Sequence, residues 1–208
     1  RDHRGRQAAD RAREADGLGA GSFYSLLKKE SLPVAPISPY ALTKYVGEKY
    51  AQLFFQMYGL PTICLRYFNV FGPKQDPFSE YSAVIPKFTM SFLNHKSPVI
   101  YGTGKQTRDF VYIDNVVDAN LLAAVSKKGY GEVFNIGSGE KISLLQLISL
   151  LQRICGKNMK PAYQKSREGD SMHSLADISK AKKILRYVPK VTFKDGLIKT
   201  FEWYNNVK

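Results

Sequence analysis

The sequence predicts an α/β protein in which short strands alternate with amphipathic helices. Short runs rich in β-branched and aromatic residues have the length of strands, and the longer segments between them carry leucine, isoleucine and valine at helical spacing. No internal repeat is present, so the alternation favours a single sheet-based architecture. Strands are expected at 62–67, 99–101, 109–112 and 133–136, and helices at 39–58, 82–94, 114–126, 143–155, 177–185 and 196–204.

The helix at 39–58 has the clearest boundary signals. Ser38 is a suitable N-cap, and Pro39 suits the first helical position because its missing N–H would be unpaired there in any case. Gly59 and Pro61 are expected to end the helix. The strand that follows, 62–67, is expected to be buried.

Composition limits the classes of function. The 208 residues fit one domain, or one domain and part of another. The net charge of +13 comes from dispersed lysines, which favours a solvated surface and an anionic ligand such as a pyrophosphate over nucleic acid. No run is long and apolar enough to span a bilayer, and no secretion signal is expected.

The cysteines and histidines suggest no metal site. Cys64 and Cys155 are isolated and are expected to be small buried hydrophobic residues. The histidines are scattered without ligand spacing. A reducing cytoplasm is the expected location, and no membrane or nucleic-acid partner is expected.

Residues 1–22 differ in composition from the rest of the chain. Arginine, alanine, aspartate, glutamate and glycine dominate this segment, and Leu18 is the only large apolar residue up to Gly21. Such a segment cannot bury a face, so it is expected to be disordered or to form a loose helix. The folded part is expected at 23–208.

Tyr40 and Lys44 are the leading catalytic candidates. They lie one helical turn apart on the same face, where the lysine ammonium stabilises a phenolate and so makes the tyrosine a better general base. The spacing alone is weak evidence, because two other pairs match it, Tyr24 with Lys28 and Tyr45 with Lys49. Tyr40 differs in standing in the first turn of its helix, just after a loop.

Tyr45 is expected to be a packed core residue. It is rotated by roughly 140° from Tyr40 on a helix of 3.6 residues per turn. Its helical neighbours Leu42, Val46 and Leu53 are apolar.

A series of motifs in one order gives the catalytic pair its context. They are Ser38-Pro-Tyr-Ala-Leu-Thr-Lys44 with Gly47-Glu48, Arg66-Tyr-Phe-Asn-Val-Phe-Gly-Pro73, Ser82-Ala-Val-Ile-Pro-Lys87, Tyr101-Gly-Thr-Gly-Lys-Gln-Thr-Arg-Asp-Phe-Val-Tyr-Ile-Asp114, Arg167-Glu-Gly-Asp170, Ala176-Asp-Ile-Ser-Lys-Ala-Lys182, Gly196 and Trp203-Tyr204. From Glu30 to Tyr204 the chain resembles the extended short-chain dehydrogenase/reductase family, in particular its NAD-dependent nucleotide-sugar epimerases and dehydratases. The resemblance implies the C-terminal part of a Rossmann-type parallel sheet plus a small α/β substrate-binding domain.

The resemblance also implies a mechanism and a cofactor, NAD. Tyr40 would remove the proton of the sugar 4-hydroxyl, Lys44 would bond the nicotinamide ribose, and Phe68 would lie beside the nicotinamide. Hydride would leave C4 for NAD and return to the opposite face of the 4-keto sugar.

The substrate-binding residues follow from the same resemblance. Arg108 and Arg167 would clamp the diphosphate, for which a guanidinium fork is well matched. The other residues expected at the nucleotide sugar are Asn69, Val84, Ile85, Pro86, Tyr101 and Asp170. Read without the resemblance, Arg108 beside Asp109 suggests a surface ion pair, Asn69 a turn residue, and Asp170 either a partner of Arg167 or a turn cap.

Two glycine-rich segments are not phosphate-binding loops. Gly17–Gly21 follows no strand, so it does not meet the dinucleotide fingerprint. Gly102–Lys105 suits a hairpin turn better than a phosphate loop.

The chain departs from the family at its start. The strand, glycine-rich turn and acidic residue that bind adenosine are missing, and so is a serine or threonine about two dozen residues before Tyr40. We therefore expect an N-terminally truncated epimerase chain, with weak NAD binding and little or no turnover.

Three functions remain open. A UDP-N-acetylglucosamine or UDP-glucose 4-epimerase leads, and a 4,6-dehydratase is the closest enzymatic alternative. A non-catalytic nucleotide-sugar-binding protein is the third. A homodimer through the helices at 39–58 and 82–94 is what the family implies.

Overall fold

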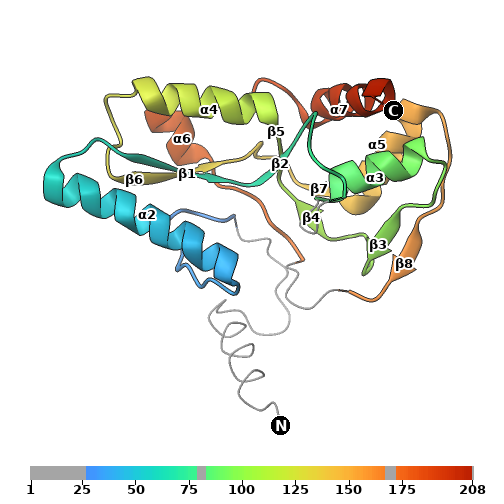
Figure 1. Ribbon diagram of the computed structural model, residues 1–208, viewed down its shortest axis with the longest axis horizontal. Coiled ribbons are helices and arrows are strands. Elements are labelled where there is room, and N and C mark those ends of the chain that lie inside the picture. Colours follow the sequence, from blue (N-terminus) through green and yellow to red (C-terminus); the bar gives the residue numbers. More distant parts are fainter. Residues whose placement is uncertain (1–26, 79–82, 167–171, 208) are drawn as a thin grey trace, which may run out of the picture.

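The computed structural model describes residues 27–78, 83–166 and 172–207 (Figure 1). Its helices are α2 (Pro39–Tyr58), α3 (Val84–Leu93), α4 (Ile113–Val125), α5 (Leu144–Cys155), α6 (Ser179–Leu185) and α7 (Phe193–Val207). Its strands are β1 (Ile63–Tyr67), β2 (Asn69–Phe71), β3 (Val99–Tyr101), β4 (Thr107–Arg108), β5 (Phe110–Tyr112), β6 (Glu132–Ile136), β7 (Ile142–Ser143) and β8 (Ala162–Gln164).

The described strands form two-stranded pairings that are mostly parallel. The pairs β1–β6, β2–β5 and β3–β8 are parallel, and β4–β7 is antiparallel. In the longest pair, Ile63 lies opposite Glu132 and Tyr67 opposite Ile136. Parallel neighbours require a crossover: the chain between β2 and β5 contains α3, and the chain between β1 and β6 contains α3 and α4. The α/β class with parallel strands is therefore confirmed.

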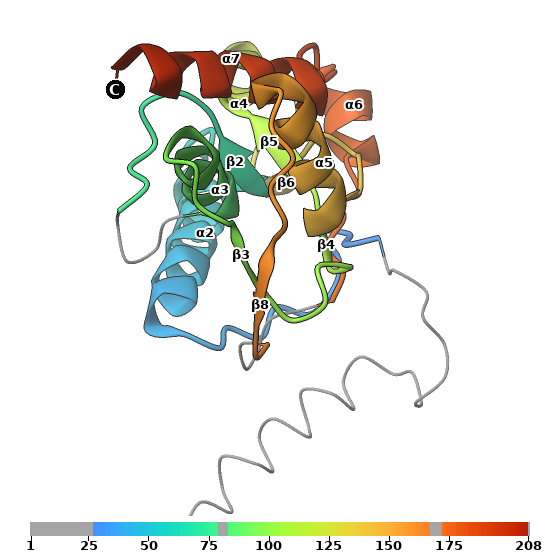
Figure 2. The ribbon, with the colours of Figure 1, turned by 90° about the vertical axis from the view of Figure 1, so that its right-hand side faces the viewer.

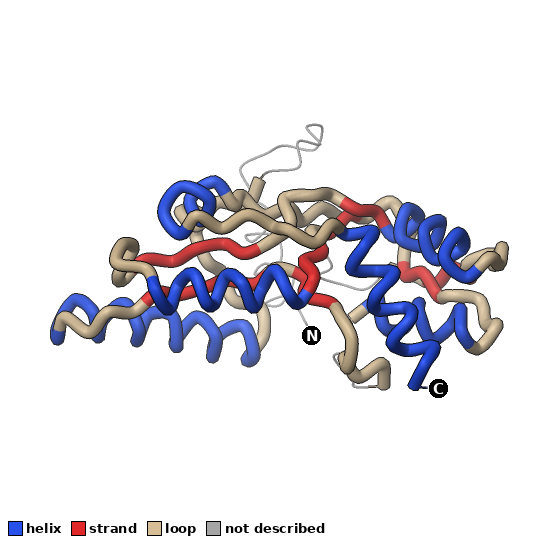
Figure 3. Tube along the Cα trace, turned by 90° about the horizontal axis from the view of Figure 1, so that it is seen from above, coloured by secondary structure: helices blue, strands red, loops and turns tan. Residues whose placement is uncertain are grey.

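The elements gather in two groups along the long axis of the molecule. Strands β1 and β6 lie between α2 on one side and α4 and α6 on the other, while α3, α5 and α7 surround the opposite end (Figures 1 and 3). Strands β2 and β5 lie where the two groups meet (Figure 1). The view along the long axis shows α7 running over α5 and α3 (Figure 2).

Each group has its own hydrophobic core. Aromatic rings build the core under α3, α5 and α7, where Phe71 meets Phe110 and Phe193 at centroid distances of 6.4 and 5.5 Å. The other core lies between β6, α4 and α6 and contains Phe134, Ile136 and Tyr187.

The expected helix at 39–58 is confirmed, with its caps. The Ser38 hydroxyl accepts the N–H of Ala41 at 3.1 Å, and Pro39 begins the helix. Gly59 ends it in the left-handed conformation, with φ of 67°, and donates its N–H to the Phe55 carbonyl.

The other elements differ from expectation mainly at their ends. Helix α3 begins at Val84 rather than Ser82, and α7 extends from Phe193 to Val207. Helix α6 begins at Ser179 because the Asp177 carboxylate accepts the Ser179 N–H, as a capping group does. Hydrogen bonding with the side chain of Ser179, and then with its backbone N–H, lowers the pKa of Asp177.

Four of the short strands were not predicted, whereas β3 and β5 were. The four are β2, β4, β7 and β8, and each is defined by a distant partner rather than by its own composition. The hairpin expected at Gly102–Lys105 is wrong, because β3 pairs with β8 and β4 with β7. The segment is still a turn, since Gly102 and Gly104 have φ of 88° and 76°.

Burial around α2 is lower than the sequence suggests. Helix α2 has no buried residue, and Leu42, Val46 and Leu53 are about half exposed, so the prediction of a core around Tyr45 is wrong. Among the described residues β1 pairs with β6 alone, which leaves this expected buried strand only partly covered.

Both cysteines are also only partly buried, against expectation. Cys64 lies on β1 beneath α2, and Cys155 is the last residue of α5. Burial of Cys64, together with the nearby Glu48 carboxylate, raises the pKa of the thiol.

In the described ranges, none of the helices combines the length and the apolar character that crossing a membrane requires.

Candidate functional site

A cavity of about 340 Å³ opens where the two groups of elements meet. Its walls come from β2, the start of α3, β4, β5 and the start of α5. The lining residues are Asn69, Val70, Phe71, Ala83, Val84, Ile85, Gln106, Arg108, Phe110 and Leu144. Four residues predicted from the sequence, Asn69, Val84, Ile85 and Arg108, therefore line one cavity.

A second cavity of about 480 Å³ adjoins the first. The two share Val84, Gln106 and Leu144. The second is mainly apolar and carries Tyr101 and Lys87 at its walls, with Phe78 as an exposed neighbour. Cavities of this size with few polar groups are typical of small-molecule sites.

Asn69 is held in place by the backbone of β5. Both its N–H and its side-chain Nδ2 donate to the carbonyl of Asp109, at 3.1 and 3.0 Å. Asn69 is the first residue of β2, so the interpretation as a simple turn residue is wrong. Its fixed amide gives the cavity a polar wall with a defined orientation.

Arg108 comes from β4 and lines the same cavity. Its Nη1 donates to the carbonyl of Thr107 at 2.8 Å. Thr107 itself is within 2.8 Å of the Nδ1 atom of His173, so both sides of this short strand are tied to neighbouring chain.

Asp109 does not form the surface ion pair that the sequence alone suggested. Its carboxylate is fully buried and accepts hydrogen bonds from the N–H and hydroxyl of Ser138 and from the N–H groups of Gly139 and Ala176. A buried carboxylate with four donors is well satisfied and rigid. Asp109 therefore joins the loop after β6 to the strand that carries Arg108.

Tyr40 and Lys44 lie on the first turns of α2, outside both cavities. The Lys44 Nζ is 5.4 Å from the centre of the Tyr40 ring, and Tyr40 is 66% exposed. Tyr45 and Lys49 have a similar separation of 5.1 Å, so this distance does not distinguish the pairs. Their placement does, because the N-terminal end of α2 points toward the middle of the molecule, where β2 and β4 lie (Figure 1).

Two other predicted residues do not join the cavities. Phe68 packs against the core around β6 and α4. Pro86 is buried within the first turn of α3 and lines neither cavity. Arg167 and Asp170 lie outside the described residues, as does the pair partner Tyr24.

Gln106 and Leu144 line both cavities, and neither was predicted as a site residue from the sequence. Gln106 is 6% exposed, and its Nε2 donates to the carbonyl of Tyr101 at 2.6 Å. Its position inside the motif from Tyr101 to Asp114 was the available signal. Leu144 begins α5 directly after the Ser143 N-cap, and no local pattern marks such a residue as part of a site.

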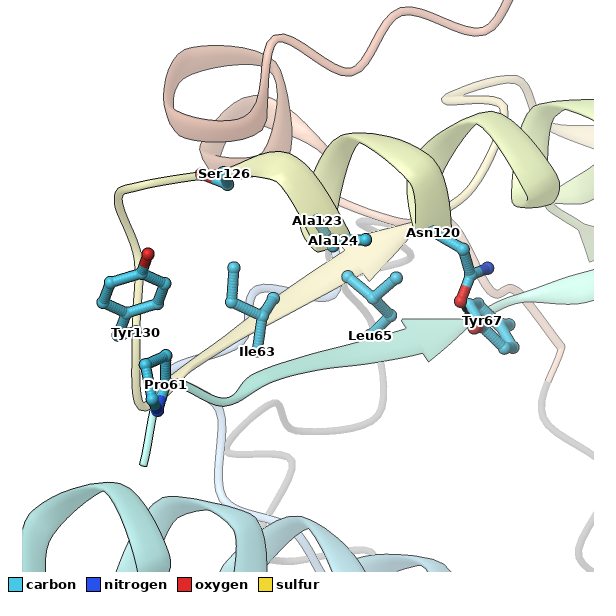
Figure 4. Close-up of a pocket in the computed structure, with 9 residues that line it drawn as sticks. All are labelled: Pro61, Ile63, Leu65, Tyr67, Asn120, Ala123, Ala124, Ser126 and Tyr130. Atoms are coloured by element: carbon cyan, nitrogen blue, oxygen red, sulfur yellow. Dashed lines mark hydrogen bonds between the residues drawn. The ribbon is translucent and has the colours of Figure 1, made fainter. Parts of the chain in front are cut away.

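A separate groove of about 390 Å³ runs between β1 and α4 (Figure 4). Ile63 and Leu65 of β1 point into it, and the Tyr67 hydroxyl donates to Asn120 of α4 at 2.8 Å. None of the predicted site residues lines it.

The geometry can be compared with known proteins. A family model described as the NAD dependent epimerase/dehydratase family matches residues 18–137. A putative UDP-glucose 4-epimerase of Methanocaldococcus jannaschii is 40% identical over 177 residues, which cover 85% of this chain and 56% of that protein. A dTDP-D-glucose 4,6-dehydratase of Bos taurus is 38% identical, over 84% of this chain and 50% of that protein.

Solved structures are similar over nearly the same share. The UDP-glucose 4-epimerase of Thermotoga maritima with UDP-glucose has a TM-score of 0.82 and 41% identity, covering 88% of this chain and 60% of that chain. The UDP-N-acetylglucosamine 4-epimerase of Methanobrevibacter ruminantium has a TM-score of 0.83 and 41% identity, covering 87% and 58%. The UDP-glucuronic acid 4-epimerase of Bacillus cereus, in complex with UDP-glucuronic acid and NAD, has a TM-score of 0.81 and 36% identity, covering 89% and 58%.

The chain spans about half the length of the curated relatives that it matches. The family model nevertheless covers more than half of the chain, and the parallel α/β fold agrees with the solved structures. The chain belongs to the NAD dependent epimerase/dehydratase family.

Proposed function

We propose that the whole protein is an NAD-dependent UDP-sugar 4-epimerase, with UDP-glucose or UDP-N-acetylglucosamine as substrate. The observation that carries the proposal is the grouping of Asn69, Val84 and Arg108 around one cavity. A guanidinium, a fixed amide and an apolar wall are the groups that a diphosphate, a sugar and a base require.

Tyr40 is the proposed general base, and it acts on the proton of the sugar 4-hydroxyl. Lys44, one turn away, stabilises the phenolate and offers an ammonium donor to a ribose hydroxyl. This phenol and ammonium fit the nicotinamide end of NAD, which when bound supplies the hydride acceptor. Phe68 is proposed to lie beside the nicotinamide.

The nucleotide-sugar contacts are proposed residue by residue. Arg108, with Arg167, would neutralise the diphosphate, and Asp170 would orient Arg167. Asn69 would accept a hydrogen bond from the sugar through Oδ1, since its Nδ2 is engaged by the Asp109 carbonyl. The remaining contacts are proposed for a base wall made of Val84, Ile85 and Tyr101, without Pro86, which lines neither cavity.

Residues 23–208 are the proposed family part of the chain, and residues 1–17 precede the stretch that the family model matches. A homodimer is proposed through α2, whose exposed apolar stripe supports a self-complementary contact. The stripe is made of Leu42, Val46, Tyr50, Leu53, Phe54, Met57 and Tyr58. Helix α3 offers no such stripe, because its apolar face packs in the core. Sedimentation of Met57→Lys tests the dimer, and unchanged self-association would remove this support.

The decisive experiment is product analysis with a matched pair of variants. The whole protein is incubated with NAD and, in turn, UDP-glucose, UDP-N-acetylglucosamine and dTDP-glucose, and the sugars are identified by NMR. We expect the 4-epimer from a UDP-sugar, and a loss of at least about 100-fold in kcat for Tyr40→Phe, the usual scale of a general base. Tyr45→Phe, which removes a hydroxyl from the same helix, is expected to retain activity.

Three outcomes would contradict the proposal. A 4-keto-6-deoxy product would favour the dehydratase, in line with the dehydratase relatives. Binding of UDP without NAD binding or turnover would favour the non-catalytic binding protein. Full activity of Tyr40→Phe would remove Tyr40 as the base.

A further inference from the structure

Arg66 of β1 and Glu48 of α2 form a two-pronged ion pair. The Nε of Arg66 lies 2.7 Å from Oε2 of Glu48, and its Nη2 lies 2.8 Å from Oε1. The side chains are 27% and 10% exposed. Two parallel N–H···O bonds restrict both the distance and the angle between the elements that carry them.

The pair lies between the N-terminal end of α2, which carries Tyr40, and the other contacts that join this helix to its neighbours. Glu48 follows Lys44 by one turn and Tyr40 by two, so all three share one side of the helix. The Cys64 thiol also donates to the Glu48 carbonyl, at 3.8 Å, and the remaining described hydrogen bonds and ring contacts of α2 with neighbouring elements lie further along. They join Ala51 to Thr62, Gln52 to Gly131 and Phe55 to Tyr130.

For the described residues, the first two turns of α2 therefore have no hydrogen bond or ion pair to another element before Glu48. When a helix is bonded to other elements only from Glu48 onward, the turns before Glu48 can change their angle relative to the sheet. At Glu48, Arg66 makes the two short side-chain bonds of 2.7 and 2.8 Å, and the Cys64 thiol makes a longer contact of 3.8 Å to the backbone carbonyl.

Arg66 is itself fixed from a second direction. Its Nη1 donates to the carbonyl of Glu30, and the Glu30 carboxylate accepts the N–H of Asn135 on β6. The hydrogen bonds to Glu48 raise the pKa of Arg66, although its burial opposes the shift. Arg66 also stands three residues before Asn69, on the strand that leads directly into the cavity.

Stability alone is a poor reason for such a pair. Partly buried ion pairs lose in desolvation much of what they gain in attraction. Their geometry is the more durable contribution, because a guanidinium fork and a carboxylate accept only one relative orientation.

We propose that Arg66 and Glu48 are positioning residues, which hold the first turns of α2 at the angle where Tyr40 reaches a substrate anchored at Asn69 and Arg108. The proposal rests on the proposed function for its catalytic consequence. A displacement of about 1 Å in a reacting group can cost about 100-fold in rate. The substrate anchors stand on β2 and β4, so binding is expected to survive the loss of the pair.

The test compares Glu48→Gln and Arg66→Lys with Asp118→Asn in the whole protein. Glu48→Gln removes the charge of one partner, and Arg66→Lys removes the planar fork. Asp118→Asn breaks a more exposed ion pair with a single contact, in which Asp118 of α4 lies 2.7 Å from Lys190. We expect kcat to fall 10- to 100-fold in the first two variants, with KM for the UDP-sugar within about twofold. Asp118→Asn should leave both constants unchanged.

Amide hydrogen exchange provides a readout that does not depend on turnover. In Glu48→Gln and Arg66→Lys, the amides at 43–47 should exchange faster, whereas those at 52–58 should keep their protection. A control with Glu48→Asp, which keeps the charge on a shorter arm, should fall between the variants and the unmodified protein in both readouts.

The outcomes separate this inference from the proposed function. One outcome is that the unmodified protein shows no epimerase activity while the amides at 43–47 exchange faster in Glu48→Gln and Arg66→Lys. That result would contradict the proposed function and support the positioning pair. Unchanged exchange and kcat would overturn the positioning pair. Faster exchange along the whole of α2 with a matching loss of thermal stability would also overturn it, because the pair would then act only on stability.

Discussion

Replacing Asp109 by asparagine tests the buried carboxylate that organises the candidate site. Asp109→Asn keeps the size of the side chain and removes its charge. In the structure, Oδ1 accepts the N–H and hydroxyl of Ser138, both at 2.7 Å, and Oδ2 accepts the N–H groups of Gly139 and Ala176 at 3.1 and 3.2 Å. An asparagine has only one acceptor oxygen.

The size of the effect follows from this arrangement. If the asparagine oxygen remains at Ser138, its NH₂ group faces the N–H groups of Gly139 and Ala176, and two charge-assisted hydrogen bonds are lost. Each is worth about 1.5–3 kcal/mol, so we expect the free energy of unfolding to fall by about 3–6 kcal/mol. For a chain of this size such a loss lowers Tm by roughly 10 °C or more.

Urea unfolding followed by circular dichroism measures the change. Asp114→Asn is the matched control, because Asp114 is exposed in the first turn of α4. It should cost only about 0.3–1 kcal/mol through the helix dipole. A loss below about 1 kcal/mol for Asp109→Asn would refute the reasoning, since it would mean that the four donors do not depend on the carboxylate.

Two further predictions concern a buried tyrosine and a crowded glycine. Burial, and then the nearby Asp109, raise the pKa of Tyr187, so the folded state holds the phenol proton more tightly than the unfolded state. The stability that this proton contributes is present below about pH 10, the pKa of tyrosine in the unfolded state, and is lost as the pH rises beyond it. Stability measured from pH 8 to 11.5 should therefore decline less steeply in Tyr187→Phe, and identical slopes would contradict the assignment. Gly131 has φ of 73°, and an added Cβ would stand 2.3 Å from the Phe55 ring, whereas Gly59 has φ of 67° and open space around it. Both alanine variants incur about 1–2 kcal/mol of backbone strain, and the free energy of unfolding of Gly131→Ala should fall by about 1–3 kcal/mol more than that of Gly59→Ala. Chemical unfolding measures both, and equal decreases would show that the Phe55 ring moves aside without cost.

Much of the local structure could be predicted because its causes are local. The Ser38 cap, the proline at the first helical position and the terminal Gly59 act within a few residues, and they define α2 as observed. The motif from Tyr101 to Asp114 and the motif around Asn69 likewise predicted residues that line one cavity.

Four of the short strands could not be predicted for the opposite reason. Strand β4 has two residues and exists because Thr107 and Arg108 pair with Ser143 and Ile142 on β7. A segment this short carries no periodic signal, and its pairing depends on chain some 35 residues away.

Burial was the property that the sequence misjudged most. Leu42, Val46 and Leu53 have the spacing of a core-facing stripe, yet all are exposed on α2. Periodicity identifies an apolar face but not the surface that covers it.

The sequence by itself determined the α/β class, the caps of α2, and the residue types that suit a nucleotide sugar. Only the tertiary structure decided that Gln106 and Leu144 join the cavity, that Pro86 does not, and that Asp109 is a buried hub. The reason is physical. Caps and helical spacing depend on neighbours along the chain, whereas cavities, burial and ion pairs depend on residues that folding brings together.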